Sequence, residues 1–276
     1  MDFSSDVLAL EVEGTVGTLW LDRPEARNAM GRAFWHDLPH AARAISELDG
    51  LRVLVLAARG PHFTVGLDLK EFGGSLFESG ERAPSKATSN ARNYAEVRRM
   101  QDAVSSIANL EIPVIAAIHG YCIGGGVDLI SACDIRLASN DAVFSIRETK
   151  IAIVADIGTL QRLPRIVPAG HVAELAFSGK DFDAQRAQSI GLVNSLHGAG
   201  PDDVLDAAKS LAKEIAANSP LAVRGTKAVL AANDGRTIDE GLDFVARWNT
   251  MFLQSNDLRE AMTAFVEKRA PHFHGD

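Results

Sequence analysis

The feature that most constrains the fold is the segment 112–164, which joins an apolar run to a cluster of glycines and then to several acids. The run IPVIAAI at 112–118 has the continuous hydrophobicity of a strand that is covered on both faces. Gly124, Gly125 and Gly126 follow this run and open a helix. A buried strand that leads through a glycine turn into a helix is typical of an α/β fold.

The rest of the chain continues this pattern. Alternating residues at 7–13 and 15–21 predict a hairpin, and a second apolar run at 51–58 predicts another strand covered on both faces. The other predicted elements are strands at 134–138, 143–146 and 191–196, and helices at 31–48, 91–109, 125–132, 169–177, 183–189, 201–217, 219–232, 237–248 and 256–268. We expect an α/β core with the site in residues 1–200 and a helical oligomerisation region in residues 201–276.

One segment lacks the spacing of hydrophobic residues that is typical of a strand or a helix. Residues 73–89, GGSLFESGERAPSKATS, are polar and contain Gly, Pro and Ser. They predict a surface loop and a candidate lid over a site.

Composition and charge exclude several classes of protein. The 276 residues are 46% hydrophobic and 23% charged, which suits a large globular domain. The net charge of −8 argues against a nucleic-acid partner, because phosphates are bound by clustered Lys and Arg. No apolar run approaches the ~20 residues of a membrane span, and the N-terminal residues lack the order of a signal peptide. We therefore expect a cytoplasmic protein with no membrane partner. Cys122 and Cys133 lack metal or disulfide spacing, so we expect no bound metal.

The glycine turn has the properties of a binding site for negative charge. Glycines let the backbone approach a ligand, and free N–H groups at a helix start favour an anion. The spacing does not fit GxGxxG or GK[ST] phosphate loops, and close strand–helix packing would use the same glycines. A second loop, FTVGLDL at 63–69, presents the turn Val65–Gly66. Because N–H groups from two loops can converge on one carbonyl oxygen, the pair predicts an oxyanion hole.

Three acids accompany these loops. Asp128 lies in the first turn of the predicted helix, and Glu148 and Asp156 follow it. Asp156 has apolar neighbours, and burial raises the pKa of a carboxyl group toward the range of a proton carrier. Each acid alone could instead be a helix cap or a surface charge, and Glu148 has Arg147 and Lys150 beside it. Together with the glycine turn, the acids predict acid–base chemistry.

These residues resemble the crotonase (enoyl-CoA hydratase/isomerase) superfamily over nearly the whole chain. The matching segments are LDRPEARNAM (21–30), FTVGLDL (63–69), IPVIAAIHGYCIGGGVDL (112–129), ACDIRLAS (132–139), GTLQRLPRIV (158–167) and AFVEKRAPHF (264–273). The resemblance implies an α/β, crotonase-like spiral of ββα units with a C-terminal helical trimerisation region. It also implies a homotrimer or a dimer of trimers.

Within the superfamily, the trio Asp128, Glu148 and Asp156 is similar to that of the Δ3,5-Δ2,4-dienoyl-CoA isomerases, whereas hydratases have Glu at the first two positions. The resemblance implies an acyl-CoA thioester as substrate and no cofactor beyond the coenzyme A that the substrate carries. It places the oxyanion-hole N–H groups on Val65 and Gly125. It assigns coenzyme A contacts to Ala26, Arg27, Asn28, Gly66, Leu67, Asp68 and, from a neighbouring subunit, Phe265 and Lys268.

The residue types agree with isomerisation. Asp128 withdraws its carboxylate by about 1.5 Å relative to Glu, so a water clamped between two carboxylates would be held poorly. We expect Glu148 to be the base at carbon 2 and Asp156 the acid at carbon 6, with Asp128 orienting the pair. The alternatives are a 2-enoyl-CoA hydratase, an acyl-CoA thioester hydrolase and a non-catalytic RNA-binding or scaffold protein, the last disfavoured by the acidic charge.

Overall fold

The main sheet is mixed and has the order β1-β2-β3-β4-β6-β9 in the computed structural model, which describes residues 3–73 and 85–276. The hairpin predicted near the N-terminus is present as β1 (Leu8–Glu13) and β2 (Val16–Leu21), which pair antiparallel. The parallel strands are β3 (Val53–Ala58), β4 (Val114–Ile118), β6 (Ile135–Ala138) and β9 (Ser195–Leu196). The strand predicted at 191–196 is thus reduced to its last two residues.

A smaller second sheet contains β5 (Tyr121–Ile123), β7 (Val143–Ser145) and β8 (Phe182–Asp183). The sequence did not predict β5 or β8, because two or three residues are too short to show an alternation. The position of β5 matters for the site, since it carries the chain from β4 directly into the glycine turn.

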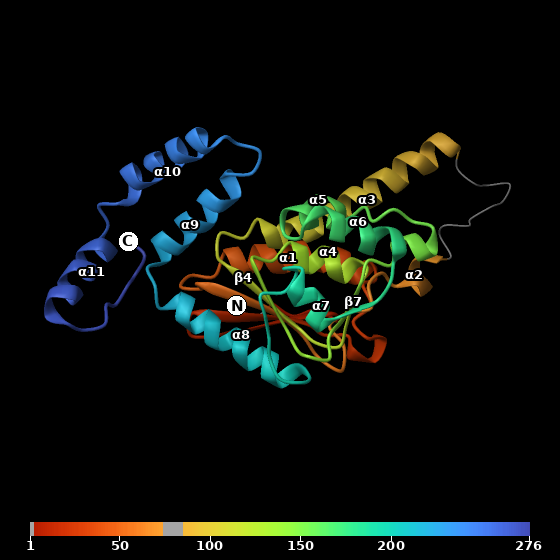
Figure 1. The fold of residues 1–276 in the computed structure, drawn as a ribbon, viewed down its shortest axis with the longest axis horizontal. Helices are drawn as coiled ribbons and strands as arrows, with labels where there is room; N and C mark the ends of the chain where they lie inside the picture. Colours follow the sequence, from red (N-terminus) through yellow and green to blue (C-terminus); the bar gives the residue numbers. More distant parts are fainter. Residues whose placement is uncertain (1–2, 74–84) are drawn as a thin grey trace.

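Helices cover both faces of the main sheet, and β3 shows why its sequence is continuously apolar. All six of its residues are buried. Leu54 and Leu56 face one core, which includes residues of α1 (Arg32–Ser46) and α3 (Lys86–Ala108). Val53 and Val55 face the other core, whose helical residues come from α8 (Pro201–Ala216). Figure 1 shows α1 and α8 on opposite sides of the strands.

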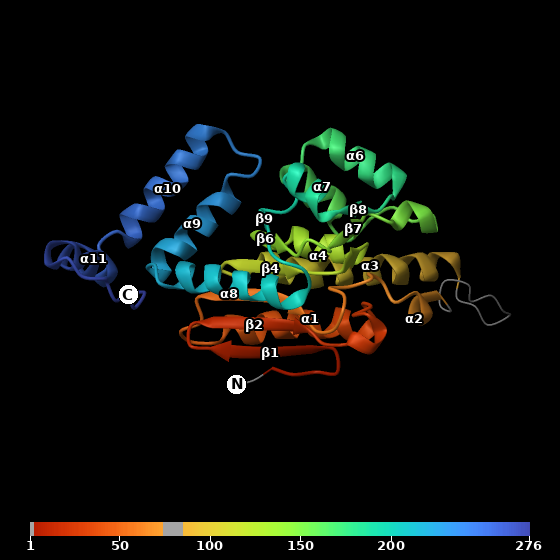
Figure 2. The ribbon, with the colours of Figure 1, turned by 60° about the horizontal axis from the view of Figure 1, so that its bottom comes forward.

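The C-terminal helices separate into two groups. The first, α8, buries Val204 and Ala208 against the sheet and so belongs to the core. The others, α9 (Pro220–Ala232), α10 (Ile238–Phe252) and α11 (Asn256–Glu267), extend away from it (Figures 1 and 2). The first helix of the predicted oligomerisation region, residues 201–276, thus packs against the sheet. The division after residue 200 stays a prediction. The role of the extended helices in trimerisation stays a prediction.

Two predicted boundaries change for local reasons. The helix α3 begins at Lys86 rather than 91, because the side chain of Ser85 accepts a hydrogen bond from the Thr88 N–H and caps it. Most of the predicted surface loop, residues 74–84, lies outside the described residues. The remaining helices are α2 (Leu69–Gly73), α4 (Gly125–Ser131), α5 (Thr159–Arg162), α6 (Ala169–Ser178) and α7 (Ala184–Ser189). None of the helices within the described ranges has the length and hydropathy that a bilayer crossing requires.

Candidate active site

A cleft of about 640 Å³, including its open mouth, lies where the loop after β3 meets the start of α4. Its lining includes the three predicted acids, Asp128, Glu148 and Asp156, and two residues of the glycine turn. The other walls are mainly Leu and Ile side chains, so the carboxyl groups face an apolar space. Such a lining suits a ligand with a hydrocarbon part.

The two glycine-containing loops are in direct contact at the cleft. Gly66 has φ +81, and a Cβ on it would lie 2.6 Å from the Ile123 carbonyl oxygen and 3.3 Å from the Gly125 nitrogen. Gly124 has φ +54, and a Cβ there would lie 3.3 Å from Oε1 of Glu148. Both glycines are therefore required by backbone conformation and by space. They also bring the start of α4 next to one of the acids.

The hydrogen bonds of these loops correct one predicted oxyanion donor. The Val65 N–H donates to the Arg27 carbonyl at 3.2 Å, so the prediction that Val65 supplies a free donor is wrong. The N–H groups of Gly66 and Asp68 are also used, by Thr64 Oγ1 and the Met30 carbonyl. The Leu67 N–H lies between them and has no acceptor among the described residues.

The other predicted donor agrees with the structure. Gly125 is the first residue of α4, where N–H groups have no partner within the helix. Its N–H has no acceptor in the described part of the chain. Gly125 and Leu67 both line the cleft, and their N–H groups are the candidate donor pair in place of Gly125 and Val65.

Glu148 is the first residue of the short 3-10 helix η3 (Glu148–Ile151). Its Oε2 is buried and has no hydrogen-bond partner among the described residues. Burial, together with the negative charges of Asp128 and Asp156, raises the pKa of Glu148 to about 7. Its basic neighbour Arg147 is paired with Asp181 at 2.5 Å and so does not neutralise Glu148.

Asp156 lies in the irregular segment between η3 and α5 and is partly buried. Burial raises the pKa of its carboxyl group above the ordinary value. Neither Asp156 nor Glu148 forms an ion pair within the described ranges. The two acids therefore share a mainly apolar cleft whose one lining cation, Arg147, is paired with Asp181 rather than with either acid. Acids in such surroundings can exchange protons near neutral pH.

Asp128 differs from the other two acids because its carboxylate is held. It is 1% exposed, and its Oδ1 accepts a hydrogen bond of 2.5 Å from the Thr159 N–H at the start of α5. Burial raises the pKa of Asp128 to about 6, against the opposing hydrogen bonds from Thr159. Asp128 thus connects α4 to the segment that carries Asp156.

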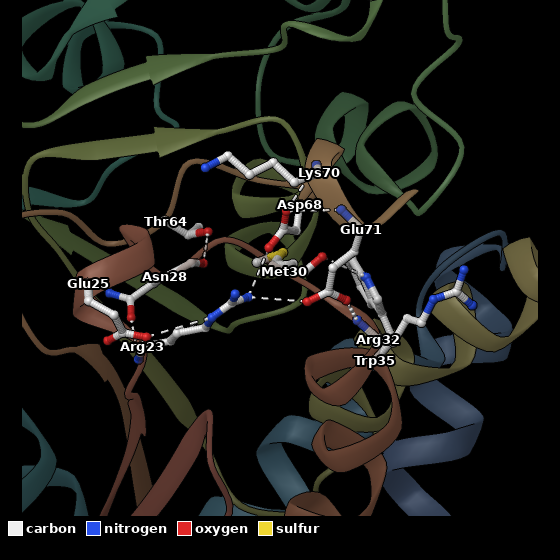
Figure 3. A network of polar contacts seen from close by, with 10 residues as sticks. All are labelled: Arg23, Glu25, Asn28, Met30, Arg32, Trp35, Thr64, Asp68, Lys70 and Glu71. Atoms are coloured by element: carbon white, nitrogen blue, oxygen red, sulfur yellow. Dashed lines mark hydrogen bonds and ion pairs between the residues drawn. The ribbon is translucent and has the colours of Figure 1, made fainter. Parts of the chain in front are cut away.

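A polar network around Arg23 uses two of the side chains that were predicted to contact coenzyme A (Figure 3). Asp68 pairs with Arg23 at 2.9 Å and also accepts a hydrogen bond from the Lys70 N–H. The Asn28 amide accepts from the Arg23 N–H and donates to the carbonyl groups of Arg59 and His62. Both side chains fix the loops, and a contact of Asn28 or Asp68 with coenzyme A stays a prediction.

Some of the remaining predicted contacts are accessible to a ligand, whereas Gly66 is buried. Arg27 is exposed and Ala26 is partly exposed at the same loop. Phe265 and Lys268 are exposed at the end of α11, which lies at the opposite end of the molecule from α2 in both ribbon views (Figures 1 and 2). They cannot reach the cleft of their own chain, so a contact supplied by a neighbouring subunit stays a prediction.

Potential metal ligands gather elsewhere. Among residues 3–73 and 85–276, His36, Asp37 and His40 on α1 have ligand atoms within 4.8 Å of one another, and none of them lines the cleft. The chemistry of the cleft can be explained by its carboxyl groups and main-chain N–H groups.

The sequence did not identify Leu67 as a donor or Thr159 as the partner of Asp128. It also missed Gln101 and Arg162, which bind the segment around Asp156. No local pattern marks Thr159 or Gln101, because their contacts join segments 31 and 55 residues apart in the chain.

Comparison with known proteins identifies the family of the chain. The model of the enoyl-CoA hydratase/isomerase family matches residues 11–276. The chain is 40% identical over 268 residues to a peroxisomal Δ3,5-Δ2,4-dienoyl-CoA isomerase of Arabidopsis thaliana, covering 97% of this chain and 96% of that one. It is 44% identical over 258 residues to a mitochondrial enzyme of the same name from Dictyostelium discoideum, covering 94% and 87%.

A solved structure gives the same fold. An enoyl-CoA hydratase from Bacillus anthracis matches with a TM-score of 0.88 and 29% identity, over 98% of this chain and 100% of that one. The chain belongs to the enoyl-CoA hydratase/isomerase family. The crotonase-like fold expected from the sequence is confirmed.

Proposed function

We propose that this protein is a Δ3,5-Δ2,4-dienoyl-CoA isomerase, which moves the double bonds of a 3,5-dienoyl-CoA to the 2,4 positions. The observation that carries the proposal is the pair Glu148 and Asp156, two acids with raised pKa values that line one mainly apolar cleft and form no ion pair with any described residue. The relatives from Arabidopsis thaliana and Dictyostelium discoideum support the same reaction.

The N–H groups of Leu67 and Gly125 would bind the thioester oxygen. Negative charge develops on this oxygen when a proton leaves carbon 2, and preorganised N–H groups stabilise such charge. The start of α4 adds the favourable dipole of a helix N-terminus. The apolar walls would take the acyl chain, and the open loop at Ala26 and Arg27 would take part of the coenzyme A.

Glu148 would remove the proton from carbon 2, and the electron pair of that C–H bond would form the new bond between carbons 2 and 3. The pair of the 3,4 double bond then moves to carbons 4 and 5. The pair of the 5,6 double bond takes a proton from Asp156 at carbon 6. Glu148 ends protonated and Asp156 ionised, so proton exchange with water restores both groups before the next turnover.

The direct test is the Asp156→Asn variant with a 3,5-dienoyl-CoA as substrate, followed by the absorbance of the 2,4-dienoyl product. We expect a loss of about 10²- to 10⁴-fold in kcat, the usual contribution of a positioned proton donor. Hydration of crotonyl-CoA by the wild-type protein is the control for a hydratase. Full isomerase activity in Asp156→Asn, or hydration faster than isomerisation in the wild type, would overturn the proposal.

A further inference from the structure

The segment that carries Asp156 has unusually little main-chain support. Residues 153–156 have no regular secondary structure. From 154 to 157, no main-chain group bonds to the main chain of another residue among those the structure describes. Ala155 and Ile157 are buried and anchor the segment by packing, whereas Val154 is 71% exposed. An acid that must meet carbon 6 is therefore placed on a segment that hydrogen bonds of regular structure do not fix.

Two side chains supply the missing support. The Gln101 Nε2 donates to the carbonyl oxygen of Asp156 itself at 2.6 Å. Arg162 donates through one nitrogen to the Ile157 carbonyl at 3.4 Å and through another to Ser105 Oγ at 2.8 Å. Since Gln101 and Ser105 are one turn apart on α3, both links run from the same face of the same helix.

The part of α3 that bears these residues is well anchored. Met100, Ala103, Val104 and Ile107 are buried there, whereas most residues in the first half of α3 are exposed. Gln101 therefore projects from a packed stretch of helix. A rigid element of this kind can hold a mobile carboxylate within the narrow range of positions that proton transfer allows.

We infer that Gln101 is a positioning residue that sets the place of Asp156 relative to carbon 6. Ser105 assists it through Arg162. This inference rests on the proposed isomerase function. It assigns Gln101 to only one of the two proton transfers, because Glu148 belongs to η3 and makes no hydrogen bond with α3 among the described residues.

The test replaces Gln101 with Met, which keeps a similar volume but removes the N–H donor. Both isomerisation and the exchange of carbon-2 hydrogen for deuterium are measured in D2O, the latter on recovered 3,5-dienoyl-CoA. We expect Gln101→Met to lower kcat for isomerisation about 10- to 100-fold, as a displacement near 1 Å would. The KM and the rate of carbon-2 exchange should stay within about twofold, since substrate binding and Glu148 are untouched.

The matched control is Gln188→Met, because Gln188 is exposed on α7 and its side chain makes no hydrogen bond within the described ranges. It should retain both rates. Ser105→Ala is a second variant that removes only the anchor of Arg162, and it should show a smaller loss of the same selective kind. It also keeps the inference testable if Gln101→Met does not fold.

The outcomes are separable. Equal loss of isomerisation and carbon-2 exchange, or no loss of either in both variants, would overturn the positioning role. Absence of isomerisation in the wild type would instead overturn the proposed function itself. Loss of isomerisation with carbon-2 exchange retained would support the role of Gln101.

Discussion

The acids of the cleft differ because of what surrounds each carboxyl group. Asp128 has a hydrogen-bond donor from α5, whereas Glu148 has a buried oxygen without a partner. An acidic residue can therefore be either a structural link or a proton carrier, and its burial and hydrogen-bond partners decide which.

Asp128 should set the pH dependence of the reaction. Glu148 must be ionised to act as base, so kcat/KM in the wild type should rise with pH around a midpoint near its pKa of about 7. Asp128→Asn keeps an oxygen for the Thr159 N–H but removes a negative charge that raises the pKa of Glu148. We expect the midpoint to move to lower pH by about half a unit or more. A pH–rate profile with an unchanged midpoint would contradict this electrostatic link.

Glu148 should lower the stability of the folded protein at neutral pH. Its pKa rises from 4.5 to about 7 on folding, so stability is fully present below pH 4.5 and is lost as pH rises toward 7. Glu148→Gln removes this loss. We expect the variant to be inactive but more stable than the wild type above pH 7, on the order of 1–3 kcal/mol. Chemical denaturation at pH 5 and pH 8 would measure the free energy of unfolding of both proteins. If the variant exceeded the wild type by the same amount at both pH values, the raised pKa of Glu148 would not be the cause.

Among the elements, the junction of the loop after β3 with the start of α4 builds the site. Gly66 lies at this junction in a conformation with φ +81, whereas Gly50 has nearly the same φ of +80 in open space. Substitution of either glycine should therefore cost a similar conformational free energy, and the two sites differ only in their neighbours.

Gly66→Ala should therefore disrupt the oxyanion hole. The added Cβ would lie 2.6 Å from the Ile123 carbonyl oxygen and would push the Leu67 and Gly125 donors apart. We expect kcat to fall about 10²- to 10³-fold, as when one donor is lost. Gly50→Ala, with nothing within 4 Å of its Cβ, should lose some stability but keep kcat. Similar kcat values for both variants would refute the role of this junction.

At the level of the whole molecule, the helices beyond α8 expose apolar side chains that the single chain leaves uncovered. They include Leu230, Ile238, Leu242, Met251, Phe265 and Val266. Exposed apolar surface of this extent favours contact with other chains. We propose that α9, α10 and α11 form the trimer, with Phe265 and Lys268 reaching a neighbour's coenzyme A. A location in the cytoplasm also remains a proposal.

A charge on this surface should separate the subunits. Met251 is 75% exposed on α10. Met251→Lys should reduce the molecular mass measured by sedimentation and raise the KM for the acyl-CoA. Tyr94→Lys on α3, where Tyr94 is 70% exposed, is the control and should leave the molecular mass and the KM unchanged. A wild-type protein that sediments as a monomer would contradict the proposed trimer.

The sequence by itself determined the α/β fold, the glycine turn and the identity of the three acids. These depend on local hydrophobic period, on backbone freedom at glycine and on a resemblance that extends over the chain. Only the tertiary structure decided that Leu67 rather than Val65 has a free N–H, that Asp128 is tied to Thr159, and that Gln101 holds Asp156. Those facts depend on which distant donors and acceptors meet, and a hydrogen bond between remote segments leaves no periodic trace in the chain.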